Sequence, residues 1–534
     1  MYFAGIKEEN GMVRTIVRLV AVTCFLSSTW WACGTETPKS ESTAEKTVDA
    51  GNTDKTVVDK KDTTEVAPEP QPEPAKPEPR PEPRPEPTKP EPVADGGHES
   101  IFEAKPEGDG PDLVFTGLTY WKDTKAIFEQ KCNRCHLAKG GIGPFPLTSY
   151  KFVNTYKQSI KTSVANGTMP PWQADKSCGT YTNDISLTPV EKAKILQWVD
   201  QGAKEGDPND YVAPPAPGKL GLDRVDLTLK MKKSYTIKKK PDDYRCFVLD
   251  WPHTTNKFVT GFQVNPGNAK IVHHVIAYIA KKSEVAQYTK KDPNGDGYTC
   301  YGTAGGPAGL RWLGVWAPGV PGAGYYKDTG IKVEPGSKII VQLHYNVLPT
   351  ANESDLTSVD FRLEDSVKKE AILFPYTNPQ WLRGQNMKIA ANDSNATHSF
   401  NLPLSFLGLV APKVKGLTIY SAMLHMHQLG ASGRLSLGGN QCLLNIPKWD
   451  FNWQLIFHLS QPVKLGMSDS VGITCSWNNS AANQPIVDGK KRTPADVYWG
   501  DGTFDEMCLG IVYMTCSDAA GQNIDCPDLS SLTD

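Results

Sequence analysis

The residues of this chain that could do chemistry are a small set of histidines and one methionine in its second half. Five of only ten histidines in 534 residues fall in three short, strand-like segments, IVHHVIAY, VQLHYNV and MLHMHQLG, and the methionine follows in DEMC. In chain order these residues are His273, His274, His344, His425, His427 and Met507. Three imidazoles suit copper or zinc, whereas a thioether sulfur selects a softer, redox-active metal such as copper(I). The pattern therefore predicts two copper sites.

Side-chain direction in a strand decides which of these histidines can share a metal. Residues i and i+2 point to the same face, so His425 and His427 can converge on one ion. Adjacent His273 and His274 point to opposite faces of an ideal strand. They can share an ion only where a β-bulge or a strong twist turns one side chain round. Histidines without such a pattern are interpreted as structural or surface residues: His98, His253, His398 and His458.

A further metal-binding pattern is CNRCH at residues 132–136. Two thiols two residues apart and an adjacent imidazole are typical of c-type haem attachment, with Cys132 and Cys135 bonded covalently and His136 as axial ligand. A chance zinc or redox pair is the alternative. Met169, in the stiff sequence GTMPP, could supply the second axial ligand or could simply be packed in a core. The segment resembles a small class I-type cytochrome c domain.

The N-terminal region is typical of an exported protein. Arg14 and Arg18 precede the apolar stretch 19–26, which is too short to span a bilayer. The stretch leads to a sequence that resembles a bacterial lipoprotein cleavage box ending at Cys33. Two tryptophans depart from the usual box, so a plain signal peptide is the alternative to lipidation. No later segment is apolar for the ~18 residues of a transmembrane helix, so we expect an anchor and no embedded segment.

Cysteine and proline usage agree with export. After Cys24 in the leader, Cys33 and the two haem cysteines, eight cysteines remain, an even number that suggests disulfides whose pairing the spacing does not determine. Twelve of the 25 residues in Pro68–Pro92 are proline, which predicts an extended polyproline II segment, either a stalk or a disordered spacer. A net charge of −2 gives no reason to expect a nucleic-acid partner.

Two kinds of secondary structure must position these residues. Residues 112–212 read as mainly helical: Asp123 predicts the start of a helix running to the haem cysteines, and Thr188 with Glu191 forms a capping box whose helix Gly202 ends. From residue 220 onward, short alternating runs separated by turn residues predict β-sandwich structure. These runs are 258–264, 338–344, 417–420 and 471–474.

The second half of the chain resembles a known family. Residues 240–515 are similar to the copper type II, ascorbate-dependent monooxygenases, the family of peptidylglycine α-hydroxylating monooxygenase and dopamine β-monooxygenase. The matching stretches are Tyr244–Cys246, HHVIAY, QLHY, HMHQLG and DEMC, in the family's order and near its spacing. By this resemblance the electron-supplying copper is bound by His273, His274 and His344. The copper where oxygen and substrate meet is bound by His425, His427 and Met507.

The resemblance also implies a disulfide framework. Two bridges are expected, Cys246–Cys300 and Cys475–Cys508, the second of which holds the strand carrying Met507. The cysteines left unassigned are Cys178, Cys442, Cys516 and Cys526.

The chain departs from the peptide-amidating members where they bind the substrate carboxylate. Those members have an arginine two residues before the HxH pair and polar residues just after the Met-Cys pair. Here these positions hold Met423, Leu509 and Ile511. A carboxylate desolvated against three apolar side chains has no compensating partner. Peptide amidation is therefore disfavoured, and we expect an apolar or weakly polar substrate.

One weaker motif is Asp292–Gly297, DPNGDG, which resembles the start of a calcium loop. Thr303 stands where the closing glutamate of such a loop would be, so a simple turn is the alternative.

These patterns predict a multidomain chain: a small all-α cytochrome c domain followed by two all-β, jelly-roll-like sandwich copper domains. The expected segments are a lipoprotein signal peptide at 1–33, a disordered Pro/Glu-rich linker at 34–111, the cytochrome c-like domain at 112–212, and copper monooxygenase domains at 220–375 and 376–534.

The expected function is that of an exported copper monooxygenase, in the periplasm or at the cell surface as an outer-membrane lipoprotein. It would hydroxylate a C–H bond of a small molecule with O2, using two copper ions and electrons that a periplasmic donor feeds through one covalent haem. A non-catalytic haem and copper lipoprotein that transfers electrons or handles copper is the main alternative, and a haem redox sensor that gates the coppers is a third.

Overall fold

The computed structural model describes residues 113–138, 143–214, 221–305, 310–318, 320, 322–346, 353–384, 386–439, 441–487 and 489–527. The expected signal peptide, the lipidation site Cys33 and the proline-rich linker lie outside these residues. Among the helices within them, none is long and apolar enough to cross a bilayer.

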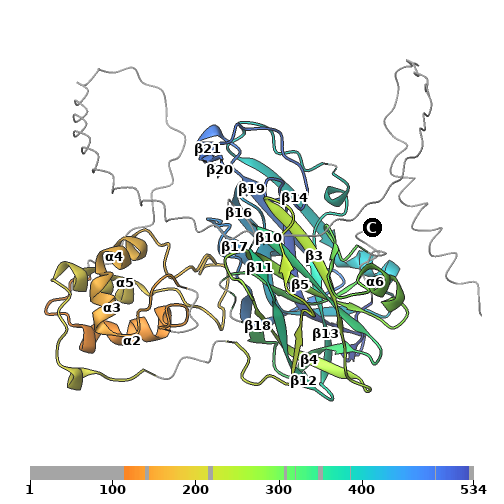
Figure 1. Ribbon diagram of the computed structural model, residues 1–534, viewed down its shortest axis with the longest axis horizontal. Helices are drawn as coiled ribbons and strands as arrows, with labels where there is room; N and C mark the ends of the chain where they lie inside the picture. The colour runs from red at the N-terminus through yellow and green to blue at the C-terminus, as the bar shows by residue number, and fades with distance from the viewer. Residues whose placement is uncertain are drawn as a thin grey trace, which may run out of the picture. The chain divides into compact units, whose positions relative to one another are not determined.

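The first part of the described chain is helical, and its helices gather in one group (Figure 1). The helical elements are η1 (Tyr120–Thr124), α2 (Lys125–Ile127), η2 (Phe128–Cys132), α3 (Tyr150–Thr155), α4 (Lys157–Ala165), α5 (Pro189–Asp200) and η3 (Pro208–Asp210). Their apolar side chains form a separate core centred on Tyr120, Phe128, Ile195 and Trp198. Cys132, the first of the predicted haem cysteines, packs against this core.

Two helix starts test the capping predictions. The capping box of α5 is confirmed: the Thr188 side chain accepts the Glu191 N–H, and the Glu191 carboxylate accepts the Thr188 N–H. Gly202, at φ +92°, ends this helix as expected. The predicted start at Asp123 is wrong, because the helix begins at Tyr120 and the hydroxyl of Thr119 caps it. Asp123 lies in the first turn, where its carboxylate accepts the Thr119 N–H.

The rest of the described chain is mainly β-structure, as predicted. Its first part contains helix α6 (Val285–Lys291) and the strands β1 (Leu227–Lys230), β2 (Tyr235–Thr236), β3 (Asp242–Asp250), β4 (Lys257–Asn265), β5 (Val272–Ala280), β6 (Tyr298–Thr299), β7 (Arg311–Trp316), β8 (Ala323–Gly324), β9 (Thr329–Val333), β10 (Lys338–Asn346), β11 (Ser354–Asp355), β12 (Ser358–Glu364) and β13 (Lys369–Tyr376).

The second part contains the strands β14 (Ala396–Pro403), β15 (Gly416–His425), β16 (Gly430–Leu437), β17 (Gln441–Ile446), β18 (Phe457–Gly466), β19 (Ser470–Trp477), β20 (Ile486–Val487), β21 (Lys490–Lys491), β22 (Leu509–Ser517) and β23 (Asn523–Ile524). Its short helices are η4 (Trp381–Arg383), η5 (Leu404–Phe406), α7 (Leu407–Val410) and η6 (Ala481–Asn483). The four runs predicted from alternating hydrophobicity lie in β4, β10, β15 and β19, so these predictions are confirmed.

One hydrogen-bonded sheet connects β5, β10 and β15, the strands that carry four of the predicted copper-binding histidines. Its main path runs β1-β12-β4-β9-β13-β7-β5-β10-β3-β6, and β13 also pairs with β22, which pairs with β15. A separate sheet has the order β14-β19-β16-β17. The expected domain division at 375/376 falls within β13. This strand pairs with β7 and β9, which precede the division in sequence, and with β22, which follows it. The two halves are therefore joined through a strand.

Close contacts show which strands pack face to face. Gly314 of β7 lies against the ring of Phe262 of β4, where an added Cβ would be 2.4 Å from ring carbons. In the second half, an added Cβ on Gly510 of β22 would lie 2.9 Å from the side chain of Leu435 on β16. Layers packed this closely through interleaved apolar side chains give the strands little freedom to shift.

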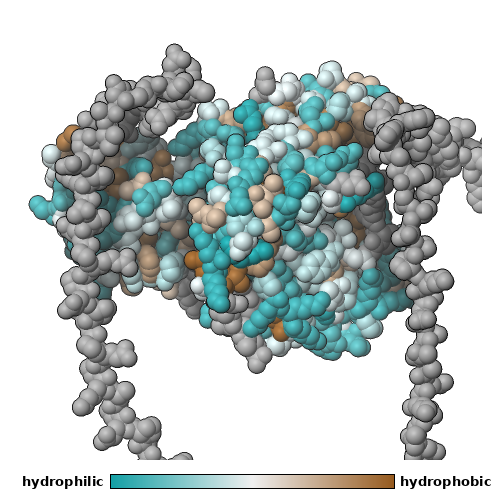
Figure 2. Space-filling model, turned by 90° about the horizontal axis from the view of Figure 1, so that it is seen from above, coloured by the Kyte–Doolittle hydropathy of each residue, from teal (hydrophilic) through white to brown (hydrophobic). Residues whose placement is uncertain are grey.

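Four disulfides link the β-structure. Cys246–Cys300 and Cys475–Cys508 are the two pairs that the resemblance implies, and Cys178–Cys442 and Cys516–Cys526 join the cysteines whose pairing the sequence left open. Such a framework is typical of a protein that folds in an oxidising compartment, which agrees with export. On the face drawn in Figure 2 hydrophilic residues predominate and hydrophobic residues form only small groups.

The contact between Gly314 and Phe262 allows the packing of β7 against β4 to be tested. Replacing Gly314 by alanine should lower the free energy of unfolding by about 1–3 kcal/mol, because the new methyl group overlaps a buried ring. The matched control is Gly408→Ala on α7, where an added Cβ meets nothing within 4 Å. Chemical denaturation of both variants checks this, and equal stability of the two would contradict the packing.

Candidate metal centre

Three imidazoles from two neighbouring strands form a compact cluster. His274 of β5 lies directly opposite His344 of β10 in the antiparallel ladder, and His273 precedes His274. The ligand atoms of all three lie within 4.8 Å of one another. The Nδ1 of His274 is 3.4 Å from Nδ1 of His273 and 3.3 Å from Nδ1 of His344. One ion could therefore be bound by three Nδ1 atoms.

A β-bulge allows the adjacent histidines to share this cluster. His344 pairs with His274 and Tyr345 pairs with Val272, so His273 has no partner residue on β10. The extra residue breaks the alternation of side chains and turns both imidazoles toward His344. The bulge or twist that the sequence required at this point is thus present.

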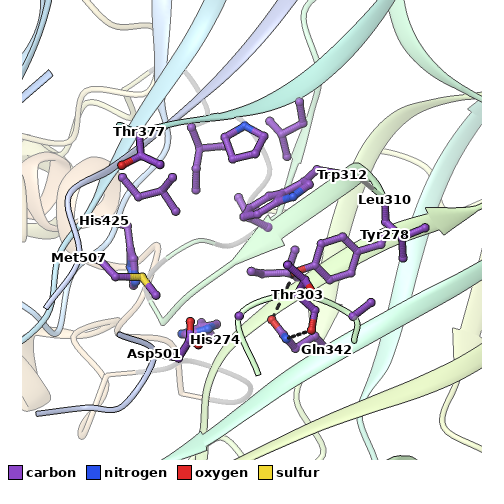
Figure 3. Close-up of a pocket in the computed structure, with 18 of the residues that line it drawn as sticks. His274, Tyr278, Thr303, Leu310, Trp312, Gln342, Thr377, His425, Asp501 and Met507 are labelled. Atoms are coloured by element: carbon purple, nitrogen blue, oxygen red, sulfur yellow. Dashed lines mark hydrogen bonds between the residues drawn. The ribbon is translucent and has the colours of Figure 1, made fainter. Parts of the chain in front are cut away.

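The second set of predicted ligands comes from β15 and the start of β22. His425 is the last residue of β15, His427 follows two residues later, and their ring centroids are 5.1 Å apart. Leu509 of β22 pairs with His425, which brings the preceding Met507 to the same end of the ladder. Figure 3 shows the Met507 side chain beside His425. The Cys475–Cys508 bridge adjoins Met507 and fixes this end of β22.

The two sets are adjacent and make one contiguous group of imidazoles. The ring centroid of His274 is 5.8 Å from that of His425. Phe451 lies over both sets, because its ring stacks on His273 at 4.6 Å and is 6.4 Å from the ring of His427.

Each of three imidazoles is oriented by a hydrogen bond at the nitrogen that points away from the cluster. His344 Nε2 lies 2.8 Å from Oδ1 of Asp242, His425 Nδ1 lies 2.5 Å from Oε1 of Gln454, and His427 Nδ1 lies 2.9 Å from the carbonyl oxygen of Asp505. A carboxylate, amide or carbonyl acceptor fixes the tautomer and leaves the other ring nitrogen free for a metal. The free nitrogens are His344 Nδ1, His425 Nε2 and His427 Nε2.

Burial keeps these imidazoles neutral. Desolvation lowers the pKa of His425 to about 4 and of His427 to about 3, and it holds the pKa values of His273 and His274 well below the ordinary value. A neutral imidazole has the lone pair that a metal requires. The copper-free fold should lose stability as pH falls below ~6.5, because unfolded histidines then take up protons that the folded ones do not bind.

Asp242 connects the first histidine set to the second half of the chain. Its carboxylate accepts hydrogen bonds from the Thr503 N–H at 2.9 Å and from the Asn346 amide at 3.2 Å, besides the bond from His344. Burial alone would raise its pKa, but the bonds from His344 and Thr503 lower the pKa to about 2. Asp242 is therefore ionised, and it joins His344 to the loop that contains Thr503, which is 261 residues from Asp242 in sequence.

Glu506 holds the second set from inside the protein. Its fully buried carboxylate accepts the backbone N–H of His427 at 2.8 Å, the N–H of Leu429 at 2.6 Å and the indole N–H of Trp477 at 2.9 Å. Burial raises its pKa to about 7. Because Glu506 also directly precedes Met507, one side chain fixes the positions of two predicted ligands.

A cavity of about 490 Å³ opens beside these ligands (Figure 3). Met423, Leu509 and Ile511, the residues that replace the polar groups of peptide-amidating members, all line it. Met423 pairs with Ile511 and His425 pairs with Leu509 across β15 and β22, so all four side chains share one face. Farther from the ligands the lining is largely aromatic and aliphatic, with Tyr278, Leu310, Trp312, Trp316 and Phe374.

Charged groups in the cavity are few. Among the described residues that line it, the one cation of fixed charge is Arg311, which is paired with Glu370 at 3.3 Å. Asp501 lies beside His274 (Figure 3), and burial raises its pKa to about 6. The lining therefore offers no free positive charge to a substrate carboxylate.

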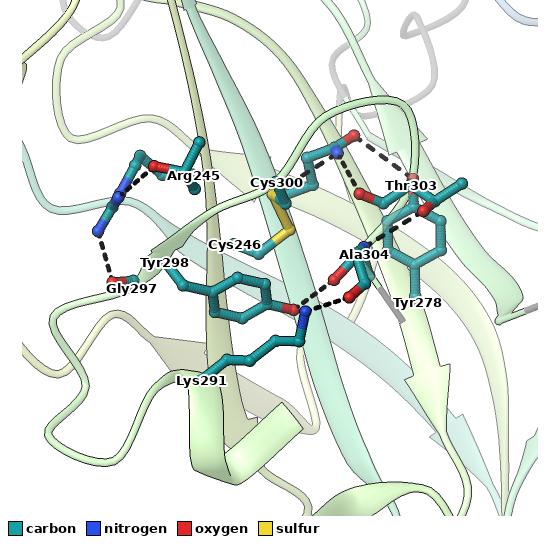
Figure 4. Close-up of a disulfide and its surroundings, with 12 residues drawn as sticks. Arg245, Cys246, Tyr278, Lys291, Gly297, Tyr298, Cys300, Thr303 and Ala304 are labelled. Atoms are coloured by element: carbon teal, nitrogen blue, oxygen red, sulfur yellow. Dashed lines mark hydrogen bonds between the residues drawn. A yellow bond between two sulfur atoms is a disulfide. The ribbon is translucent and has the colours of Figure 1, made fainter. Parts of the chain in front are cut away.

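The disulfide Cys246–Cys300 holds one wall of the cavity (Figure 4). It joins β3 to the loop that continues through Thr303 and Ala304, both of which line the cavity. The carbonyl oxygen of Ala304 accepts the Tyr298 hydroxyl at 2.6 Å, and that of Thr303 accepts the Gln342 amide at 3.1 Å.

The predicted haem residues lie at the end of the first helical segment. Cys132 and Cys135 are free thiols rather than a disulfide, and burial raises the pKa of both, that of Cys132 to about 12. His136 Nδ1 is 2.8 Å from the carbonyl oxygen of Phe145, which leaves Nε2 for an axial bond. This donor set fits a c-type haem. Met169, half-buried after α4, stays a prediction.

The calcium-like motif is a turn in which the carboxylates already have partners. Asp292 accepts the N–H groups of Val248 at 3.0 Å and Gly297 at 2.9 Å, and Asp296 pairs with Lys233 at 2.8 Å. The simpler interpretation of this motif is favoured.

Two groups that orient the predicted ligands could not be identified from the sequence. Asp242 and Gln454 have no motif of their own, and they meet His344 and His425 only through the fold. The sequence signal for Glu506 was its position directly before the predicted ligand Met507 in DEMC.

Comparison with known proteins gives no family match. No family model matches it, and no curated protein is significantly similar. Among solved structures, one of a peptide-N(4)-(N-acetyl-β-D-glucosaminyl) asparagine amidase is 8% identical, with 55% of this chain and 96% of that one covered and a TM-score of 0.26. The major capsid protein P2 from bacteriophage PM2 is 7% identical, with coverages of 55% and 99% and a TM-score of 0.22.

Glu506 is expected to control copper binding at the second set. In Glu506→Gln the amide nitrogen faces a backbone N–H donor, which should weaken copper binding there ~10–100-fold, as is typical when a group supporting a ligand is replaced. Competition with a chelator, followed by copper EPR, measures this. Exposed Glu364→Gln is the control, and unchanged affinity in folded Glu506→Gln would contradict the assigned role.

In the Glu506→Gln variant, which removes the carboxyl group that titrates near pH 7, copper affinity at the second set should be nearly constant from pH 7 down to about pH 5. Imidazoles with the ordinary pKa of ~6.5 take up protons in this range and compete with copper. The depressed pKa values of His425 and His427, about 4 and about 3, delay this competition to lower pH. Calorimetric titrations across the range, with circular dichroism to verify folding, check this. A steep loss of affinity between pH 7 and 6 would contradict it.

Proposed function

We propose that this chain is an exported copper-dependent monooxygenase that hydroxylates a C–H bond of a small apolar or weakly polar molecule with O2. The observation that carries the proposal is a group of five neutral imidazoles, three of them buried and two half-buried, beside a largely apolar cavity. Its lining includes His274, His425, His427 and Met507. A site built only to store or carry copper has no need of a cavity of this volume beside its ligands.

The sequence resemblance supports the same function. The motifs that carry it supply all six predicted ligands, and the two disulfides it implies are the pairs found, Cys246–Cys300 and Cys475–Cys508. We assign one copper ion to His273, His274 and His344, and the other to His425, His427 and Met507. Copper ions bound there would supply one-electron redox chemistry and activation of O2.

The protein's own side chains position these ligands and exclude water. Asp242 and Gln454 orient His344 and His425, while Glu506 holds the segment that carries His427. The aromatic and aliphatic lining keeps the space beside the ligands poorly hydrated, which strengthens electrostatic interactions within it. No nucleophile from the protein is required for this reaction.

The cavity lining supports the choice of substrate class. Met423, Leu509 and Ile511 lie on the same face as His425 and would contact the substrate near the second copper. With Arg311 paired to Glu370, a substrate carboxylate would be desolvated without a partner, which disfavours peptide amidation.

We further propose that residues 112–212 form a cytochrome c-like domain whose haem is bonded to Cys132 and Cys135, with His136 and Met169 as axial ligands. An electron donor of the periplasm would reduce this haem. Lipidation of Cys33 and an outer-membrane location belong to the same proposal, and the four disulfides support an oxidising compartment.

The proposal predicts two copper ions and one haem per chain. His344→Ala and His427→Ala should each lose one copper. His398→Ala, whose imidazole contacts the Lys388 carbonyl and the rings of Trp381 and Trp477 but none of the predicted ligands, should retain both. Metal analysis and copper EPR check the stoichiometry.

With a reductant, O2 and a panel of apolar compounds, the unaltered protein should form hydroxylated product in amounts equal to the O2 consumed. His427→Ala should lose this reaction. If O2 uptake yields only peroxide with every compound, the chain is an electron-transfer or copper-handling protein instead.

A further inference from the structure

A segment next to the predicted haem ligand Met169 is fastened to the β-structure. We call residues Trp172–Asn183 the strap. A disulfide joins its Cys178 to Cys442 of β17. Backbone and side-chain hydrogen bonds connect it to β17 and β18, including Asp175 N–H to the Asn445 carbonyl at 2.9 Å and Ser460 N–H to the Thr180 carbonyl at 2.9 Å. The strap is thus fixed to β17 by a disulfide and to β17 and β18 by hydrogen bonds.

Aromatic packing anchors the strap as well. The ring of Phe457 is 5.0 Å from that of Trp172 and 5.4 Å from that of Tyr181, and these two rings are 5.9 Å apart. Tyr181 and Phe457 are buried in the main core of the β-structure, as is Ala174. The strap therefore belongs to that core, although in sequence it lies between helices α4 and α5.

The loop that follows β17 contacts both sets of histidines. We call residues 449–456 the cluster loop. Phe451 stacks on His273 with an interplanar angle of 22°, Gln454 accepts the hydrogen bond of His425, and the Trp449 indole donates to the carbonyl of His427 at 3.1 Å. Within the described residues, the ring of Phe451 is the one stacked on His273, whereas the imidazoles of His274 and His344 meet it edge-on.

Two hydrogen bonds join the strap to the cluster loop: the Asn183 side-chain amide donates to the Ile456 carbonyl at 2.7 Å, and Gln173 donates next to Phe451. The side-chain amide of Gln173 donates to the backbone carbonyl of Asp450 at 3.2 Å, and Phe451 is the next residue. From the strap to His273 the connection is one hydrogen bond, one residue of covalent chain and one ring stack. Met169 is three residues before Trp172, so the same segment carries the predicted axial ligand.

We propose that Gln173, Asp450 and Phe451 form the electron path from the haem of the helical domain to the copper held by His273, His274 and His344. Electron tunnelling favours short, bonded and stacked connections over gaps, and this connection is rigid because the Cys178–Cys442 bridge fixes its start. In each event the reduced haem iron loses one electron and the oxidised copper gains it. No proton or bond is exchanged. This inference rests on the function proposed above.

The path assigns distinct roles to the two histidine sets. The contact made by Phe451 with His273 is a face-to-face stack at 4.6 Å, whereas its ring meets His427 edge-on at 6.4 Å. Electrons from the haem should therefore reach the first set. An external electron donor would then not need to bind beside the cavity, where the second set would react with O2.

Laser flash photolysis of the full chain with haem and copper loaded tests the path. Photogenerated 5-deazariboflavin semiquinone reduces the haem under anaerobic conditions, and haem absorbance then follows its reoxidation by copper. In the unaltered protein this reoxidation should be first-order, independent of protein concentration and absent without copper. Phe451→Leu should slow it about tenfold or more, which corresponds to ~1.4 kcal/mol in activation free energy. Phe451→Tyr should retain a rate near that of the unaltered protein.

The controls separate the path from a general loss of structure. Phe400→Leu replaces a half-buried aromatic residue of β14, which is in a different sheet from the strands that carry the predicted copper ligands, and should leave the rate unchanged. Gln173→Ala interrupts the path from the strap side without contacting a metal ligand, so it should slow reoxidation with the copper EPR spectrum unchanged. If Phe451→Leu disturbs copper binding, the reoxidation rate of Gln173→Ala decides whether electrons follow this path.

The outcomes of this experiment also distinguish the two proposals. Unchanged reoxidation in both Phe451→Leu and Gln173→Ala, with both metals bound, would overturn the path and leave the proposed function intact. An unaltered chain without covalent haem, or one whose reduced haem is not reoxidised by bound copper, would overturn the haem-fed function together with the path.

Discussion

The desolvation of five imidazoles is the constraint on which the rest of the candidate site depends. A buried imidazole that becomes charged without a partner is costly, so burial holds each of these groups in its neutral form. The fold then has to satisfy one ring nitrogen of each oriented histidine and leave the other free. Asp242, Gln454 and the Asp505 carbonyl do this for His344, His425 and His427. A chain without these acceptors could keep the same histidines and still bind metal poorly.

Two carboxylates in this site hold the predicted ligands through hydrogen bonds, and their pKa values are shifted in opposite directions. Asp242 accepts bonds from His344 and Thr503 that keep it ionised, so it can hold an imidazole whose partner nitrogen binds a cation. Glu506 is fully buried among backbone N–H groups and an indole, and its pKa is raised to about 7. A negative charge shared among three donors near bound copper would reduce the net charge that the interior must accommodate. Positioning and charge balance are therefore performed by the same residues.

Much of this arrangement could be predicted from local sequence, and the remainder depended on contacts that no local pattern encodes. The strand runs at 258–264 and 338–344 were evident from alternation, and the need for a bulge at His273 followed from the geometry of adjacent residues in a strand. The division at 375/376 was expected to separate two domains, yet β13 pairs across it, because a strand buried on both faces has the same composition wherever its partners lie. The predicted helix start at Asp123 was wrong because Thr119 can also cap a helix. Its side chain accepts the N–H of Lys122, so the helix begins at Tyr120.

The strap shows why a second domain in the sequence need not be independent in the structure. Residues between α4 and α5 would be expected to complete the helical core, but Trp172 and Tyr181 pack on Phe457 and Cys178 is bonded to Cys442. A bridge closing a loop of 264 residues restricts the unfolded chain strongly, and it would be excessive for a flexible tether between separate modules. Rigid attachment has a use when the distance between two redox groups sets the rate of exchange, since small changes in separation then change that rate steeply. The position of the strap, directly after the predicted axial ligand and against the loop that contacts both histidine sets, is where such rigidity would act.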